Sequence, residues 1–315
     1  MDTVRPTLVS DLLRGATTLF TEAGIASPEA DALELLAHAW SIDRAALSRR
    51  RLFDEPVPES VSARFAELCD QRRRRTPLQH LTGIAHFRHL QLQVGPGVFV
   101  PRPETELLAG AVLTELSELS ELADTDSTTK NNKARRPFVI DLCSGSGAIS
   151  LSVATEFDRV DVLGVERESA ALEWSLKNLE QCRLGESTVE FISEDATTIA
   201  KARPDLCGRV DIVVTNPPYV PDSAVPRDPE VAEHDPAAAL YGGSTGLEIP
   251  ALIIGQAEHL LRPGGLFLME HGEEQGPGAR DLLEGSASLR QAETYPDYTG
   301  RDRYTVARRA ETHSG

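Results

Sequence analysis

Residues 210–219 read VDIVVTNPPY, and this stretch decides the fold of the larger part of the chain. The run at residues 210–215 is rich in β-branched side chains and predicts a buried strand. Two consecutive prolines cannot donate to a strand ladder, so the strand must stop at Asn216. Its carboxyl end therefore carries a carboxamide, the carbonyl of Pro217 and the ring of Tyr219. In open α/β sheets, ligands bind at that end of the strands.

The tetrapeptide at residues 216–219 fits a planar NH2 group. Such a group could donate one hydrogen to the side-chain oxygen of Asn216 and one to the carbonyl of Pro217, with its face against Tyr219. An isolated Asn-Pro pair would favour a plain turn, but four such residues after a buried strand favour a binding site. We therefore take Asn216, Pro217 and Tyr219 as candidate catalytic residues, and we add Pro218 to them for substrate binding.

Strands and helices alternate on both sides of this stretch, which predicts a parallel sheet covered by helices. The fold class is α/β, a Rossmann-like, doubly wound and mostly parallel sheet. A final pair of strands within residues 292–309 predicts an antiparallel edge hairpin. The expected strands are 138–142, 160–166, 188–193, 210–216 and 265–270, and the expected helices are 147–156, 168–183, 246–262 and 273–285.

Ahead of this domain, residues 1–76 predict a small all-α domain. One helix ends near Gly24, a second runs from the cap at Ser27 to Trp40, and a third starts near Pro58. The arginine run at residues 72–75 could be a solvated helix end or a docking patch. The pattern of residues 77–100 predicts a β-hairpin linker that turns at residues 95–97. Residues 101–311 are expected to form the sheet domain, and the composition of residues 117–136 predicts a disordered insertion within it.

A cofactor pocket is expected beside the tetrapeptide, in the loop DLCSGSGA at residues 141–148. Its small residues let the backbone approach a ligand at a helix N-terminus. The incomplete glycine fingerprint and the lack of lysine favour S-adenosylmethionine over a dinucleotide. Glu166 can accept ribose hydroxyls, and Asp195 lies within reach of an adenine amino group. The candidate cofactor-binding residues are Asp141, Cys143, Ser144, Gly145, Ser146, Gly147, Glu166, Asp195, Ala196 and Asn216.

Composition excludes several classes of function. The chain has 315 residues and a formal net charge of −17, which opposes direct nucleic-acid binding through phosphate neutralisation. It has no apolar stretch long enough to span a membrane and no signal-peptide pattern, so we expect a cytoplasmic protein with no membrane partner. The four cysteines are scattered, and no metal site is expected.

The chain resembles the HemK/PrmC protein-glutamine N5-methyltransferases over nearly its whole length. The resemblance rests on PLQHLTG at residues 77–83, PRPETE at 101–106, the glycine loop, NPPY, the segments at 230–240 and 261–265, and GRDR at 300–303. This sequence departs from the family at three positions of the pocket wall. Cys143 stands where glycine is common, Glu166 where aspartate is usual, and Ala196 where a bulkier residue is found.

The resemblance implies methyl transfer from S-adenosylmethionine to the side-chain amide nitrogen, N5, of the glutamine in the Gly-Gly-Gln loop of class 1 peptide-chain release factors. It also implies that the helical N-terminal domain docks the substrate. Two alternatives remain open. NPPY also occurs in amino-directed DNA and RNA methyltransferases, which flip a base into the cleft, and a non-enzymatic adaptor could retain the fold.

Overall fold

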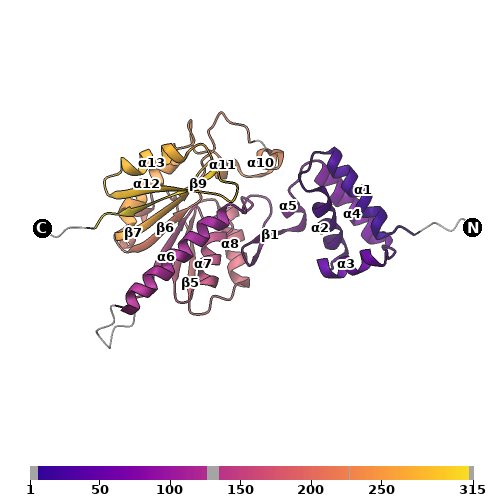
Figure 1. Ribbon diagram of the computed structural model, residues 1–315, viewed down its shortest axis with the longest axis horizontal. Coiled ribbons are helices and arrows are strands. Elements are labelled where there is room, and N and C mark those ends of the chain that lie inside the picture. Colours follow the sequence, from indigo (N-terminus) through magenta and orange to yellow (C-terminus); the bar gives the residue numbers. More distant parts are fainter. Residues whose placement is uncertain (1–5, 126–134, 227, 312–315) are drawn as a thin grey trace, which may run out of the picture. The chain divides into compact units, whose positions relative to one another are not determined.

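The strand that precedes Asn216 lies in the middle of a seven-stranded sheet of order β5-β4-β3-β6-β7-β9-β8. Strands β3 to β7 are mutually parallel, whereas β9 runs antiparallel to both β7 and β8. The predicted doubly wound sheet with an antiparallel edge hairpin is thereby confirmed (Figure 1). The strands are β3 (Phe138–Leu142), β4 (Asp161–Glu166), β5 (Thr188–Ser193), β6 (Val210–Thr215), β7 (Leu261–Glu270), β8 (Leu289–Pro296) and β9 (Asp302–Arg309).

The computed structural model describes residues 6–125, 135–226 and 228–311. Within these residues the chain divides into two units: residues up to 84 together with 228–234 form one, and the remainder forms the other. The larger unit holds the sheet and its helices. These helices are α6 (Thr105–Thr125), α7 (Ala148–Glu156), α8 (Ser169–Gln181), α9 (Ile199–Ala202), the 3-10 helix η1 (Pro204–Leu206), α11 (Ala237–Leu240), α12 (Glu248–Leu260) and α13 (Gly276–Glu284).

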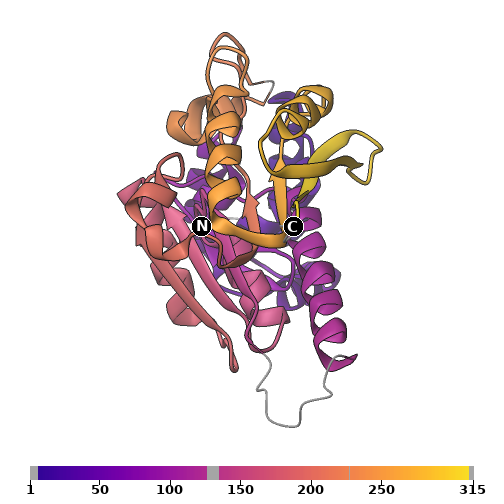
Figure 2. The same cartoon turned by 90° about the vertical axis from the view of Figure 1, so that its left-hand side faces the viewer.

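Alternating side chains of the central strands build two separate apolar cores. Val213 packs on one face of the sheet, with residues of α12 and α13, whereas Ile212 and Val214 pack on the other, with residues of α6 and α7. All six residues of β6 are buried, as expected for a strand covered by helices on both faces. The β8–β9 hairpin lies beside α13 at the edge of the sheet (Figure 2).

The order of the strands reverses between β3 and β6. From β3 the chain builds outward through β4 and β5, and it then returns to place β6 on the other side of β3. Leu142 at the end of β3 pairs with Thr215 at the end of β6, and the hydroxyl of Thr215 donates to the carbonyl of Leu142 at 2.7 Å. The glycine loop and the NPPY segment therefore leave the sheet side by side, at the point where doubly wound sheets bind ligands.

The smaller unit is a bundle of helices around its own apolar core, which includes Phe20, Leu35 and Phe65. Helix α3 was not predicted, because only Leu47 of its nine residues is buried and its surface is arginine-rich. The helices are α1 (Val9–Glu22), α2 (Pro28–Trp40), α3 (Arg44–Leu52), α4 (Glu59–Arg73), α5 (Leu78–Thr82) and, from a distant part of the sequence, α10 (Pro229–His234).

The arginine run at the end of α4 is neither simply solvated nor an open patch. Arg72 is 7% exposed, and its Nε lies 2.7 Å from Asp31 Oδ2 while its Nη1 lies 2.7 Å from Glu230 Oε1. Arg75 binds the other oxygen of Glu230, with Nη2 at 2.6 Å. The run thus holds α10 onto the helical bundle through a buried ion-pair cluster, which sequence proximity could not reveal.

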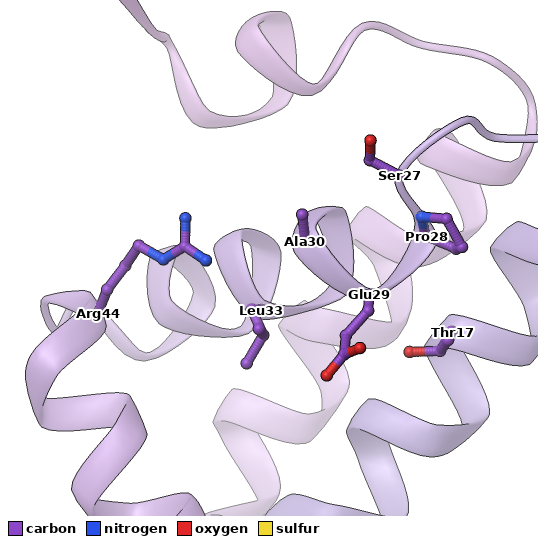
Figure 3. Close-up of a pocket in the computed structure, with 7 residues that line it drawn as sticks. All are labelled: Thr17, Ser27, Pro28, Glu29, Ala30, Leu33 and Arg44. Atoms are coloured by element: carbon purple, nitrogen blue, oxygen red, sulfur yellow. The ribbon is translucent and has the colours of Figure 1, made fainter.

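The helical unit also carries a cavity of about 480 Å³. Figure 3 shows its lining side chains, which come from α1, α2 and the start of α3. None of the candidate catalytic or cofactor-binding residues lines it. The residues are Thr17, Ser27, Pro28, Glu29, Ala30, Leu33 and Arg44.

Three details of the expected connections were wrong. The linker's hairpin pairs β1 (Ile84–Phe87) with β2 (Leu90–Gln93), so it turns at residues 88–89 and not at 95–97. Arg88 adopts a φ of +51° in that turn, a left-handed conformation that is uncommon for arginine and that no local pattern predicted. Residues 78–82 of the linker form helix α5, and α6 continues to Thr125, so residues 117–125 of the expected insertion are helical. Residues 126–134 of that insertion lie outside the described residues.

In the described part of the chain, no helix is both long and apolar enough to cross a membrane.

Candidate active site

The glycine loop after β3 is shaped by left-handed backbone conformations. Cys143, Gly145 and Gly147 have φ values of +67°, +56° and +81°. The backbone N–H groups of Cys143 and Ser144 donate to the carbonyl of Val165 at 3.0 and 3.1 Å, which fastens the loop to β4. A side chain at Gly147 would meet Phe191 at 2.7 Å, whereas one at Gly145 would meet nothing within 4 Å. Gly145 therefore borders open space where a ligand could approach the backbone.

Asp141 supports the loop from within the fold. It is 1% exposed, and its Oδ2 accepts hydrogen bonds from the backbone N–H and the hydroxyl of Ser150 at 3.2 and 2.6 Å. Its Oδ1 and the hydroxyl of Ser144 are buried without a hydrogen-bond partner within the described residues. Burial raises the pKa of Asp141 to about 7, the charge of Glu166 adds to the rise, and the two bonds from Ser150 oppose it. The structure thus gives Asp141 an evident role in anchoring the start of α7.

Glu166 ends β4 with both carboxylate oxygens oriented by the backbone. Oε2 accepts from the N–H of Gly145 and Oε1 from the N–H of Glu168, both at 2.9 Å. Burial raises the pKa of Glu166, although these backbone donors oppose the shift. Each carboxylate oxygen keeps a second lone pair, so the side chain can still accept hydrogen bonds from a pair of ligand hydroxyls.

Asp195 and Ala196 follow β5 at the same edge of the sheet. Asp195 Oδ1 accepts from the N–H and the hydroxyl of Thr197, at 2.8 and 2.7 Å. Burial alone would raise the pKa of Asp195, but the bonds from Thr197 and the charge of Arg167 lower it overall. Ala196 is buried in the core beneath the strand ends. This edge of the sheet therefore offers carboxylates at the ends of two adjacent strands.

These residues fit a nucleoside that carries no phosphate. Open space borders Gly145 and an oriented carboxylate stands at Glu166. The loop at residues 143–147 contains no lysine or arginine. The carboxylates suit hydroxyl and amino donors, and they would repel a pyrophosphate.

Asn216 and Pro217 each present one hydrogen-bond acceptor, the side-chain oxygen of Asn216 and the backbone carbonyl of Pro217. The side-chain Nδ2 of Asn216 donates to the hydroxyl of Thr105 at 3.2 Å, which leaves the side-chain oxygen facing elsewhere. Among the described residues, none donates a hydrogen bond to Asn216 Oδ1 or to the carbonyl of Pro217. Asn216 is half-buried and Pro217 and Pro218 are buried. Two neighbouring unengaged acceptors are what a target NH2 group requires.

Tyr219 is fixed at both ends. Its hydroxyl donates to Glu270 Oε1 at 3.3 Å, and its backbone carbonyl accepts from Gln275 Nε2 at 2.9 Å. Burial and the charge of Glu270 raise the pKa of its phenol, so Tyr219 is neutral at physiological pH. Gly246 lies so close that a Cβ there would approach the carbonyl of Tyr219 to 2.1 Å. Contacts at its hydroxyl and at its backbone carbonyl therefore fix the position of Tyr219.

Three residues of this candidate site were not predicted from the sequence: Thr105, Glu270 and Gln275. Thr105 belongs to the PRPETE segment, whose Arg102 also binds the buried Asp235 at 2.6 Å. Glu270 is the last residue of a predicted strand next to β6, so its position at the strand ends was a usable signal. Gln275 lies in no recognised motif, and only the fold brings it to Tyr219.

Replacing Asp141 with Asn should flatten the pH dependence of stability. Because the folded pKa of about 7 exceeds the ordinary 3.8, the folded chain binds this proton more readily than the unfolded chain. This group's contribution to the free energy of unfolding is complete below about pH 4 and is lost as the pH rises to about 7. Urea unfolding of the wild type and Asp141→Asn across this window measures the effect. The exposed Asp158→Asn serves as control, and equal slopes in all three proteins would contradict the buried titration.

Comparison with known proteins gives two family-model matches. The PrmC N-terminal domain matches residues 11–83, and a methyltransferase domain matches residues 137–310. The chain is also similar to a solved 16S rRNA methyltransferase from T. Thermophilus in complex with AdoMet and guanosine. That likeness has a TM-score of 0.46 and 22% identity, and it covers 72% of this chain and 49% of the other.

Curated relatives named "Release factor glutamine methyltransferase" match almost end to end. The one from Bifidobacterium longum is 42% identical, over 95% of this chain and 99% of its own length. The one from Streptomyces coelicolor is 39% identical, over 94% and 96%, and the one from Mycobacterium tuberculosis (strain ATCC 25618 / H37Rv) is 37% identical, over 93% and 89%. The chain therefore belongs to the release factor glutamine methyltransferase family, and it is an S-adenosylmethionine-dependent methyltransferase.

Proposed function

We propose that this enzyme methylates the side-chain amide nitrogen of the glutamine in the Gly-Gly-Gln loop of class 1 peptide-chain release factors, in the cytoplasm. The observation that carries the proposal is the pair of unengaged acceptors, Asn216 Oδ1 and the Pro217 carbonyl, beside the nucleoside pocket. A primary carboxamide has two N–H donors in one plane, which match those two acceptors. Membership of the family supports the choice of a glutamine.

In this proposal the chain's own residues work mainly by placement. An amide nitrogen is a poor nucleophile, because its lone pair is delocalised into the carbonyl. Bound S-adenosylmethionine supplies an electrophilic methyl group. Asn216 and Pro217 orient the nitrogen and favour the positive charge that grows on it, while Tyr219 covers one face of the amide and excludes water. The methylated nitrogen then loses one of its protons to water.

The cofactor would be held by the residues at the ends of β3, β4 and β5. Glu166 would accept the ribose hydroxyls, Asp195 would bind the adenine amino group, and Ala196 would contact the base. The loop from Cys143 to Gly147 would supply close backbone contact, and Asp141 would hold that loop in shape through Ser150. Asn216 borders the pocket through the pairing of β3 with β6.

The test is transfer of a tritiated methyl group to purified release factor, with a Gln→Ala substitution in its Gly-Gly-Gln loop as control. Label on the wild-type factor alone supports the proposal. Label on DNA or RNA would instead support an amino-directed nucleic-acid methyltransferase, which the net charge of −17 disfavours. If neither the release factor nor the nucleic acids became labelled, the proposal that this protein transfers a methyl group to any of these substrates would be wrong.

Replacing Glu166 with Ala should raise the KM for S-adenosylmethionine by about 10- to 100-fold and leave kcat nearly unchanged. Each hydrogen bond to a charged group contributes about 1.5–3 kcal/mol, and the hydroxyls that Glu166 would bind take no part in the chemistry. Initial rates at varied cofactor concentration measure the split between the two constants. A fall in kcat at unaltered KM would contradict the assignment.

A further inference from the structure

Around Asn216 lie two buried polar groups, Thr105 and Glu270, to which the proposed chemistry gives no role. Thr105, which begins α6 and is 4% exposed, accepts a hydrogen bond from Asn216 Nδ2. Glu270 ends β7, the strand beside β6, and is 1% exposed. Met269 pairs with Thr215, so Glu270 and Asn216 follow directly after paired residues at the same edge of the sheet. The hydroxyl of Tyr219 donates to Glu270 Oε1 at 3.3 Å.

The direction of these hydrogen bonds matters for Asn216. A threonine hydroxyl has one proton to donate and two lone pairs with which to accept. An ionised carboxylate can only accept. Glu270 Oε2 is buried without a hydrogen-bond partner within the described residues, so it is a vacant acceptor for the one proton of the Thr105 hydroxyl, a group that favours the charged form of Glu270. If Thr105 gives its proton to Glu270, its lone pair must take a hydrogen from Asn216 Nδ2, and Asn216 Oδ1 is then left for the target.

The opposite direction of these hydrogen bonds would prevent Asn216 from binding the target amide. If Glu270 were neutral, its carboxyl proton could go to Thr105, and Thr105 could then donate to Asn216 Oδ1. The carboxamide would turn over, and Asn216 would present its NH2 group to the NH2 group of the target. Two donors facing each other leave both unsatisfied, which is costly in a site shielded from water.

We propose that Glu270 and Thr105 are positioning residues, which fix the carboxamide of Asn216 with its oxygen toward the target amide. This inference rests on the proposed function, because it assigns an orientation to the acceptor used there. Glu270 performs the same task for Tyr219 by accepting its hydroxyl proton. Neither Glu270 nor Thr105 needs to touch the substrate.

The surroundings of Glu270 make the arrangement sensitive to pH. Burial raises the pKa of Glu270 to about 7, and nearby Glu104 adds to the rise. Thr105, the charge of Arg303 on β9 and the hydroxyl of Tyr219 oppose it. The ionised form, which orients Asn216 correctly, is therefore depleted as the pH falls below about 7. We expect kcat to decline on that acid side.

The experiment measures kcat, the KM for release factor and direct binding of S-adenosylmethionine by calorimetry, over a range of pH. Thr105→Val removes the hydroxyl at nearly constant shape, Thr105→Ser restores it, and Glu270→Gln removes the charge. Thr114→Val is the matched control, since Thr114 lies on the same helix with its hydroxyl bonded only to the carbonyl of Gly110. Glu115→Gln controls for losing a buried carboxylate, because Glu115 pairs with Arg308.

We expect Thr105→Val to lower kcat by about 10- to 100-fold, as removal of an orienting partner does in other sites, with unchanged cofactor binding. Thr105→Ser should recover most of that loss. Glu270→Gln should lower kcat similarly and remove the decline on the acid side. Three outcomes would overturn the inference while leaving the proposed function intact. They are a wild-type kcat in Thr105→Val, a loss of kcat in Thr105→Ser as large as that in Thr105→Val, and a decline of kcat at low pH in Glu270→Gln equal to that of the wild type. Failure of the wild type to methylate release factor would overturn both.

Discussion

Replacing Asn216 with Ala is expected to abolish most of the methyl transfer while leaving the cofactor bound. In the proposed function, the side chain supplies one of two preorganised acceptors for the target amide, because its Nδ2 is engaged by Thr105 and its oxygen is left for the target. Removing one preorganised hydrogen-bonding group of this kind costs about 2.7–4 kcal/mol of transition-state stabilisation, which is a factor of about 100 to 1,000 in kcat. The Pro217 carbonyl would remain, so the target could still bind, but in a looser orientation.

The measurement is a single-turnover assay with tritiated cofactor and purified release factor, because it separates chemistry from product release. Calorimetry with S-adenosylmethionine shows whether the pocket at Glu166 is intact in the variant. Asn216→Asp is an informative companion, since it keeps an acceptor but carries a charge next to Thr105. Methylation by Asn216→Ala at close to the wild-type rate would remove Asn216 from the mechanism. A loss of cofactor affinity of the same size would make Asn216 a cofactor ligand instead.

Much of the fold followed from local pattern. Strands β3 and β5 have the predicted bounds, because each is an extended run limited by polar or glycine-containing segments. Strand β7 begins at Leu261 and not at residue 265, because Leu261 pairs with Val210 and Leu266 with Ile212, and a register shift between the two pairs accommodates residues 262–265. A proline followed by two glycines predicts a break, and only pairing with a neighbour overrides it.

The residues of the candidate site fall into two groups, those that the sequence pattern predicted and those that it did not. Those that end a strand or form the glycine loop, such as Asn216 and Glu166, could be predicted because parallel strands bring their carboxyl ends to one edge. Those that hold them in place could not. Thr105 comes from the start of a helix and Gln275 from a loop, and the distance in sequence from Gln275 to Tyr219 is spanned only by the folded chain. Positioning residues act through tertiary contacts, so local sequence carries little signal for them.

The arginine run at residues 72–75 is another case in which tertiary contacts could not be predicted from local sequence, and here the contacts affect stability. Helix periodicity predicted correctly that residues 72–75 end a helix, but it could not predict that Arg72 points into the bundle. Its two partners, Asp31 and Glu230, are 41 and 158 residues away in sequence. Buried charges occur in proteins only when they are paired. A buried arginine in a run of exposed ones therefore signals distant carboxylates that no local pattern identifies.

Replacing Arg72 with Met should destabilise the helical unit by about 3–5 kcal/mol, the usual cost of removing one partner of a buried ion pair. Glu230 would keep Arg75 at 2.6 Å, but Asp31, which is 7% exposed, would lose its guanidinium partner. Adding Asp31→Leu to Arg72→Met should restore much of the stability, because an apolar pair of similar size has no charge left to desolvate.

Arg14→Met is the matched control: its partner Asp11 and Arg14 itself are largely exposed, and such pairs contribute less than about 1 kcal/mol. Hydrogen exchange of the α2 and α4 peptides reports this unit separately from the sheet, which a global melt would not. Protection in Arg72→Met equal to that in Arg14→Met would mean that the cluster adds nothing to the unit's stability. If the double variant were as unstable as Arg72→Met, the lost packing of the arginine stem, and not the stranded carboxylate, would be the cause.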